Sequence, residues 1–210
     1  MLKQLIAKLK IAELSALSLL FLGVATMPVA AEIDPDLDPV ESAVLGTDSD
    51  LPWSEPVQIN DPFEGDFVGV FDRHFFSKRL LNTTVRVEVQ SLWTQDFIRV
   101  LSTIRDIDCA SAPIGRILSP GCSEFSNPKN ITQLLIKING EILTLERQGS
   151  IFPVSESVAI ALKNAPEAII PIRLVSDTGE IIDSEIGAGT VEAWKVIYGT
   201  GAIAEYPSEP

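Results

Sequence analysis

Histidine and cysteine, on which much enzyme and metal chemistry depends, are nearly missing from this sequence. Its 210 residues include one histidine, His74, and two cysteines, Cys109 and Cys122. A closed zinc site needs four ligands, which these three residues alone do not supply. A Ser-His-Asp or Cys-His arrangement would have to use His74, and no Gly-x-Ser-x-Gly motif accompanies it. We therefore predict no catalytic, cofactor-binding or metal-ligating residues, and no cofactor.

Lysine and arginine are absent from residues 32–66, although the whole chain has a net charge of −13. The acids of this segment are Glu32, Asp34, Asp36, Asp38, Glu41, Asp48, Asp50, Glu55, Asp61, Glu64 and Asp66. Net negative charge repels nucleic acids and anionic lipid surfaces, so we expect neither as a partner. Residues 32–62 are also rich in Pro, Asp and Ser, which predicts an acidic leader that is extended or disordered. Trp53 is the one large side chain of this leader, and a candidate anchor for a partner.

Long apolar runs are absent after residue 31, so no membrane span is expected there. Residues 1–31 have the three parts of a cleavable signal peptide: lysines among the first ten residues, an apolar core over 17–24, and the small-residue exit Val29-Ala30-Ala31. The alternative is an uncleaved membrane anchor, and the small-residue exit favours cleavage. We expect an exported protein of bacterial type, in the periplasm, in the cell envelope or outside the cell.

The two cysteines are separated by 12 residues that include two prolines and two glycines. In an exported chain such a pair is most simply a disulfide, so we predict a bond between Cys109 and Cys122 that closes this loop. In the chain-entropy treatment, a loop of this size contributes about 3 kcal/mol to stability.

The clearest local structure is a hairpin over residues 131–147. Two alternating apolar segments, 131–138 and 141–147, flank Asn139-Gly140, a pair that accepts the positive φ angles of a type I′ turn. The resulting register predicts one apolar face, formed by Leu134, Ile136, Leu143 and Leu145.

Further elements follow from apolar alternation and from turn residues. Strands are predicted over 83–93, 168–175, 180–186 and 191–198. One short helix is predicted between the N-cap Ser155 and Pro166. Residues 97–105 fit a strand or a helix, and their β-branched content favours a strand. Residues 63–81 are rich in aromatic side chains without a clear period, and no element is assigned to them.

These elements predict a mainly β fold, a single antiparallel sandwich-like or open-barrel domain with one short helix. We place this domain at residues 63–206, followed by a tail over 207–210. The alternative is an α+β domain in which residues 95–106 are helical.

Several short motifs have a functional and an ordinary interpretation, and the ordinary one is favoured each time. Asp177-Thr178-Gly179 is the tripeptide that carries the catalytic carboxylate of aspartic peptidases, but it also suits a hairpin turn. Gly187-Ala188-Gly189-Thr190 is too short for a dinucleotide motif and is interpreted as a glycine bulge between strands. The alternating acids of 34–38 lack the glycine and the glutamate of a calcium loop. Asp72-Arg73-His74 is interpreted as a solvated or turn cluster.

The sequence therefore predicts an exported, non-enzymatic binding or structural protein of the periplasm or cell envelope. The alternative is a secreted hydrolase that uses carboxylates, as glycosidases do, because such residues carry no local signature. An aspartic peptidase using Asp177 is a minor variant of that alternative. A third hypothesis is that the acidic leader folds onto a partner protein, with Trp53 as the anchor.

Overall fold

The computed structural model describes residues 37–46, 50–80, 83–109 and 122–199. All of them belong to Ala31–Pro210, the second of the two units into which the chain divides. The predicted signal peptide over 1–31 and the predicted tail over 207–210 lie outside the described residues.

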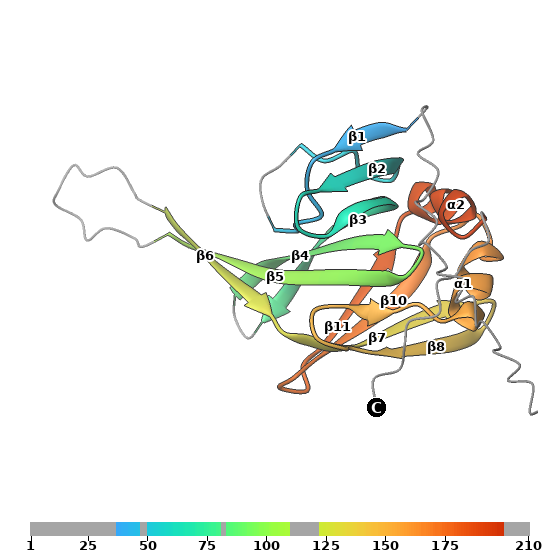
Figure 1. The fold of residues 1–210 in the computed structure, drawn as a ribbon. Coiled ribbons are helices and arrows are strands. Elements are labelled where there is room, and N and C mark those ends of the chain that lie inside the picture. Colours follow the sequence, from blue (N-terminus) through green and yellow to red (C-terminus); the bar gives the residue numbers. More distant parts are fainter. Residues whose placement is uncertain (1–36, 47–49, 81–82, 110–121, 200–210) are drawn as a thin grey trace, which may run out of the picture. The chain divides into compact units, whose positions relative to one another are not determined.

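A large sheet contains most of the first half of the described chain (Figure 1). Its strands are β1 (Asp38–Val40), β2 (Pro56–Asp61), β3 (Gly65–Leu80), β4 (Thr83–Thr94), β5 (Phe97–Cys109) and β6 (Cys122–Lys129), in that spatial order, and β9 (Phe152–Pro153) also pairs with β5. The β1–β2 pair is parallel, and the other pairs are antiparallel. Each long strand is therefore the neighbour of the strand that precedes it in sequence.

A second, smaller antiparallel sheet follows, with the order β11-β10-β7-β8. Its strands are β7 (Ile131–Ile138), β8 (Glu141–Glu146), β10 (Ile170–Ser176) and β11 (Ile181–Ile186). The predicted Asn139-Gly140 hairpin is confirmed: Ile138 pairs with Glu141, and both turn residues have positive φ angles, 51° and 87°. The strands predicted over 168–175 and 180–186 are confirmed as the antiparallel pair β10–β11, joined by the turn at Asp177-Thr178-Gly179.

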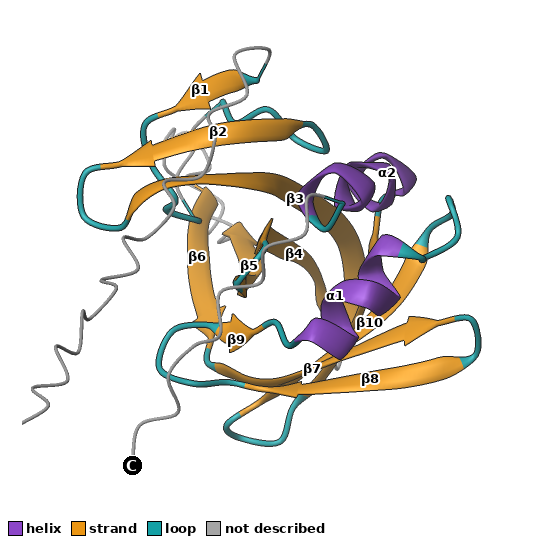
Figure 2. Cartoon of the chain, turned by 45° about the vertical axis from the view of Figure 1, so that its right-hand side comes forward, coloured by secondary structure: helices purple, strands orange, loops and turns teal. Residues whose placement is uncertain are grey.

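Two helices lie beside each other near one end of the two sheets (Figure 2). Helix α1 (Glu156–Lys163) is the predicted short helix, and Ser155 accepts a hydrogen bond from the Val158 N–H as its N-cap. Helix α2 (Ala188–Ile197) follows β11 after Gly187. No helix in the described part of the chain has the length and apolar character needed to cross a membrane.

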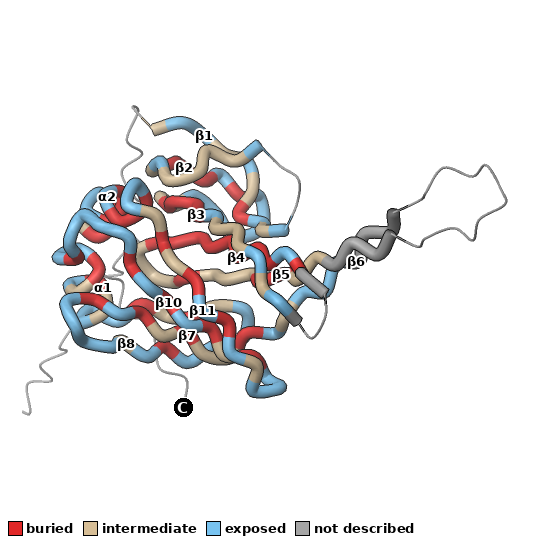
Figure 3. Tube along the Cα trace, turned by 180° about the vertical axis from the view of Figure 1, so that it is seen from behind, coloured by how far each residue is buried: buried red, intermediate tan, exposed pale blue. Residues whose placement is uncertain are grey.

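Apolar side chains of both sheets and both helices form one core between the sheets. Trp93 of β4 and Trp194 of α2 are fully buried there, with ring centroids 4.6 Å apart. Buried positions recur along β4, β7, β10 and β11 in Figure 3. A smaller apolar cluster around Phe71 and Leu92 lies on the opposite, outer face of the large sheet. The predicted mainly β fold is thus confirmed, with two facing sheets.

The segment predicted as an extended or disordered leader contains ordered structure in its described residues, 37–46 and 50–62. Strands β1 and β2 belong to it, and Val57 and Ile59 are fully buried in the outer apolar cluster. The carboxylate of Asp61 accepts hydrogen bonds from the backbone N–H groups of Ala43, Phe63 and Glu64, and these bonds lower its pKa. The sheet therefore begins before Phe63, because the alternating apolar residues of β2 suffice for a strand that pairs with both β1 and β3.

The strand predicted over 191–198 is wrong, because these residues lie in α2. The buried side chains of α2 include Val191, Trp194 and Ile197, a spacing of three residues that is typical of a helix. Val196, which a strand would place beside Trp194, is 47% exposed. The predicted glycine bulge at 187–190 is wrong for the same reason, since Gly187 is the N-cap of this helix.

The alternative fold with residues 95–106 helical is also wrong, because β5 is a strand that pairs with β4 and β6. Residues 63–81, to which the sequence assigned no element, contain the 16-residue strand β3. Asp72-Arg73-His74 is part of β3, and Asp72 is buried, so the interpretation as a solvated or turn cluster is wrong.

Candidate functional site

A row of arginines crosses the outer face of the large sheet. Alternate residues of β3 point to this face, and the register of β4 and β5 brings Arg86 opposite Ser77 and also opposite Arg105. We call this surface the arginine face, and define it by Trp53, Arg73, Phe75, Arg79, Arg86, Glu88 and Arg105.

Glu88 is the buried centre of the arginine face, with only 2% of its side chain exposed. Its Oε1 accepts hydrogen bonds from Arg73 Nε at 2.8 Å and from Gln90 Nε2 at 2.7 Å. Its Oε2 lies 2.9 Å from Arg105 Nη2. The two arginine side chains remain 31% and 30% exposed. One buried carboxylate therefore orients two guanidinium groups that still reach the solvent.

Aromatic rings contact two arginines of the face, Arg73 and Arg86. The guanidinium carbons of Arg73 and Arg86 lie 4.2 Å and 4.3 Å from the centroid of the Phe75 ring. Arg73 also lies 5.3 Å from the centroid of the Trp53 ring, which packs edge-on against Phe71. Such cation–π contacts limit the conformations of the guanidinium groups.

Four guanidinium groups and one carboxylate give the arginine face a local charge of about +3, although the chain as a whole is acidic. Arg79 and Arg86 are exposed and form no ion pair with described residues. A guanidinium can bind a carboxylate, sulfate or phosphate group through two parallel hydrogen bonds. The chemistry available here is therefore recognition of anions.

A second polar cluster joins β3 to β11, two strands that share no backbone ladder. His74 Nδ1 lies 2.9 Å from Ser184 Oγ, and His74 Nε2 lies 3.4 Å from Glu185 Oε1. The imidazole ring also stacks on Phe76. In serine hydrolases, too, a serine hydroxyl and a carboxylate contact the two ring nitrogens of one histidine. Here the serine is buried, and its partners close the seam between the two sheets.

Asp72 begins this seam by capping helix α2. Its Oδ1 accepts hydrogen bonds from Thr190 Oγ1 at 2.5 Å and from the Gly187 N–H at 3.3 Å. Burial raises the pKa of Asp72 above its usual value, although these two hydrogen bonds act in the opposite direction. Gly187 has no side chain to cap the helix, so a residue from another strand supplies the cap.

We predict that Asp72→Ala lowers the free energy of unfolding by about 2 kcal/mol. The variant removes the acceptor of the Gly187 N–H and leaves the buried Thr190 hydroxyl with Ser54 Oγ alone, 3.0 Å away. Asp72→Asn keeps an oxygen acceptor and removes the desolvated charge. Because the raised pKa favours the native state only while Asp72 is protonated, wild type loses this contribution as the pH rises through that pKa. The asparagine variant therefore gains stability relative to wild type between pH 3 and pH 7.

Urea unfolding of wild type and of both Asp72 variants, at the two pH values, measures these differences. If Asp72→Asn costs as much as Asp72→Ala at pH 7, the interpretation of Asp72 as a hydrogen-bond acceptor for α2 is wrong.

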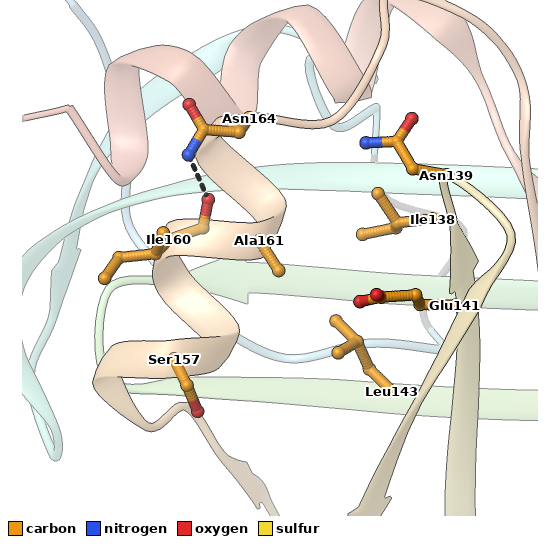
Figure 4. Close-up of a pocket in the computed structure, with 8 residues that line it drawn as sticks. All are labelled: Ile138, Asn139, Glu141, Leu143, Ser157, Ile160, Ala161 and Asn164. Carbon is orange, nitrogen blue, oxygen red and sulfur yellow. Dashed lines mark hydrogen bonds between the residues drawn. The ribbon is translucent and has the colours of Figure 1, made fainter.

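A groove of about 200 Å³ lies between α1 and the tip of the β7–β8 hairpin (Figure 4). Apolar and polar residues line it in equal number: Ile138, Leu143, Ile160 and Ala161, and Asn139, Glu141, Ser157 and Asn164. Asn164 donates a hydrogen bond to the Ile160 carbonyl. The volume is below that of common small-molecule sites, about 300 to 1,000 Å³. The groove therefore does not suggest a ligand site.

The residues singled out from the sequence lie in separate places. Trp53 borders the arginine face, and Asp177 is exposed in the β10–β11 turn, where it accepts a hydrogen bond from Asn130. Cys109 and Cys122 are directly opposite each other in the β5–β6 pair. Their side chains lie outside the described ones, so the disulfide stays a prediction. Within the described residues, no group of three His, Cys, Asp or Glu side chains is arranged to hold a metal ion.

The choice among these sites rests on their geometry. Comparison with protein-family models, curated proteins and solved structures finds no match. The arginine face remains the strongest candidate, because Arg73, Arg86 and Arg105 are held by Glu88 or Phe75 and are still accessible. Only Trp53 could be singled out from the sequence, since the charged members come from three strands and converge only through strand register.

Proposed function

We propose that this chain is an exported, non-enzymatic binding protein of the periplasm or cell envelope, and that the arginine face is its binding surface. The observation that carries the proposal is the Arg73–Phe75–Arg86 stack above the buried Glu88. Its ligand presents anionic groups. Export rests on the predicted signal peptide over 1–31, and N-terminal sequencing of the exported protein tests cleavage after Ala31.

The cost of the arginine face to stability supports a role in binding. Arg86 and Arg105 are direct cross-strand partners, and like charges in this position destabilise a sheet. Natural proteins are only marginally stable, so a costly arrangement suggests a benefit elsewhere. Fixed guanidinium groups also lose less side-chain entropy when a ligand binds.

Titration with dextran sulfate tests this proposal, with affinity measured by isothermal titration calorimetry on the full exported chain. We expect binding at low salt that weakens as the salt concentration rises. Arg79→Ala/Arg86→Ala removes two guanidinium groups without breaking an ion pair within the described chain, and should weaken binding at least about tenfold. Lys137→Ala/Arg147→Ala, which removes two exposed positive charges at the β7–β8 hairpin, is the matched control and should change the affinity less than about twofold. Absence of binding, or equal losses in both variants, would contradict the proposal.

A disulfide between Cys109 and Cys122 is part of the proposal for an exported protein. Direct cross-strand partners have Cα atoms about 4.5 to 5.5 Å apart, within the range that disulfides span. We predict that the exported protein is two hydrogen atoms lighter than its reduced form and resists alkylation until it is reduced. Cys109→Ser should then lower the free energy of unfolding by about 3 kcal/mol. Alkylation of both cysteines in the untreated native protein would contradict the disulfide.

A secreted hydrolase is the second candidate function, and the seam around His74 is the observation that favours it. Asp72 has a raised pKa and the nearby Glu185 carboxylate adds to that shift, so the pair could divide acid and base roles. Turnover of a panel of fluorogenic glycosides, with loss of activity in Glu185→Gln, would support this function. If the wild-type protein turns over none of these glycosides, the hydrolase function is contradicted and the contacts around His74 have a structural role.

A further inference from the structure

We infer that the ligand of the arginine face is an extended acidic peptide segment with carboxylates at alternate residues. This inference rests on the function proposed above and names the chemistry of the partner. It follows from three features of the face: its covered aromatic rings, the spacing of its guanidinium groups, and its single internal carboxylate.

The aromatic rings of the face are already covered by arginine side chains. Arg73 precedes Phe75 by two residues, and Arg86 lies opposite Ser77, two residues after Phe75. The two guanidinium groups therefore approach the ring from opposite directions along the strand, at 4.2 Å and 4.3 Å from its centroid. Sugar rings and nucleic-acid bases stack on open aromatic faces. A ligand of the arginine face must instead be recognised through its anionic groups.

The spacing of the guanidinium groups follows the period of a β-strand. Arg73 and Arg79 lie on β3 itself, and Arg86 lies at the level of Ser77. Side chains on one face of a strand recur about every 6.6 to 6.8 Å. An extended peptide laid along β3 has the same period, so carboxylates at its residues i, i+4 and i+6 would fall at the levels of these three arginines. A peptide with acids at alternate positions satisfies this pattern in several registers.

Glu88 is a carboxylate of the protein itself that already binds two guanidinium groups, as the carboxylates of the ligand would. It engages Arg73 through Nε and Arg105 through Nη2, so both guanidinium groups are fixed from beneath. The Nη groups of Arg73 and the whole guanidinium of Arg86 form no hydrogen bond with described residues. These groups are the ones available to bind planar carboxylates from above.

A pair of synthetic peptides tests the inference: (Glu-Thr)₄, in which glutamates alternate, and a peptide of the same composition with its four glutamates adjacent. On the full exported chain, we expect the alternating peptide to bind at least about five times more tightly than the block peptide. Arg86→Lys, which keeps the charge but not the planar fork, should reduce that preference at least about threefold. Lys137→Gln, an exposed charge on the smaller sheet, is the control and should leave both affinities unchanged.

The outcomes separate the inference from the proposed function. Equal affinities for the two peptides, or tighter binding of the block peptide, would overturn the inference. The proposed function would still stand if dextran sulfate bound through Arg79 and Arg86. Failure of dextran sulfate and both peptides to bind would overturn both. Tight binding of dextran sulfate without measurable binding of either peptide would assign the face to sulfated carbohydrate instead, and would also overturn the inference.

Discussion

Replacing Glu88 by alanine is expected to lower the free energy of unfolding by about 3 kcal/mol. The carboxylate is buried, and its removal leaves two guanidinium groups and the Gln90 amide without their common acceptor. Breaking a buried ion pair costs about 3 to 5 kcal/mol. We expect the lower end because Arg73 and Arg105 are each about a third exposed and can regain water. Urea unfolding of the variant and of wild type measures the difference.

Two further variants identify the cause of this loss. Glu88→Gln keeps an oxygen acceptor and should cost less than Glu88→Ala. Glu146→Ala removes an exposed carboxylate that bonds only Gln133 in the described chain, and should cost no more than about 0.5 kcal/mol. Because loss of Glu88 also makes the arginine face more positive, Glu88→Gln should bind dextran sulfate more tightly than wild type. Lower stability with weaker binding would contradict this account of Glu88.

Replacing Trp194 by alanine is expected to cost about 4 kcal/mol of unfolding free energy, the largest single effect that we predict. Trp194 is fully buried on α2 and packs against Trp93 in the core between the sheets. Truncation of a buried tryptophan loses its transfer free energy and leaves a cavity that the surroundings fill only in part. Thermal or urea unfolding measures the loss, with refolding checked to establish reversibility.

Val196→Ala is the matched control, two residues along the same helix. Val196 lies on the exposed side of α2, so its truncation should change stability by less than about 0.5 kcal/mol. In a strand, residues 194 and 196 would share a face and both substitutions would be costly. Similar large losses in the two variants would therefore contradict the helical assignment.

Local sequence signals predicted the parts of the fold that depend on neighbouring residues. The Asn139-Gly140 turn determined the β7–β8 register, and Ser155 marked the start of α1. In each case a turn or cap residue and the apolar pattern indicated the same element. Such agreement is the physical reason that these two predictions are confirmed.

Helix α2 was missed because its apolar residues fit two periods. Trp194, Val196 and Tyr198 alternate as in a strand, while Val191, Trp194 and Ile197 have helical spacing. The usual N-terminal signal was absent, since Gly187 has no capping side chain. Asp72, more than 100 residues earlier in the chain, supplies the cap instead. A tertiary contact of this kind has no local sequence signature.

The candidate sites were beyond sequence analysis for a related reason. Glu88 occupies a position that alternation marks as solvent-facing, yet its side chain is buried and pairs with arginines of both neighbouring strands. The contacts of His74 with Ser184 and Glu185 join residues about 110 positions apart. Strand register and the packing of one sheet on another create both clusters, and neither can be inferred from composition.

The most direct test of the arginine face is a titration with (Glu-Thr)₄ followed through the indole N–H resonances of the three tryptophans. Trp53 borders the face under Arg73, whereas Trp93 and Trp194 are fully buried in the core between the sheets. We predict a saturable shift of the Trp53 resonance, abolished in Arg79→Ala/Arg86→Ala, with the other two resonances unchanged. A saturable shift confined to Trp93 or Trp194, or no shift at all, would contradict binding at the arginine face.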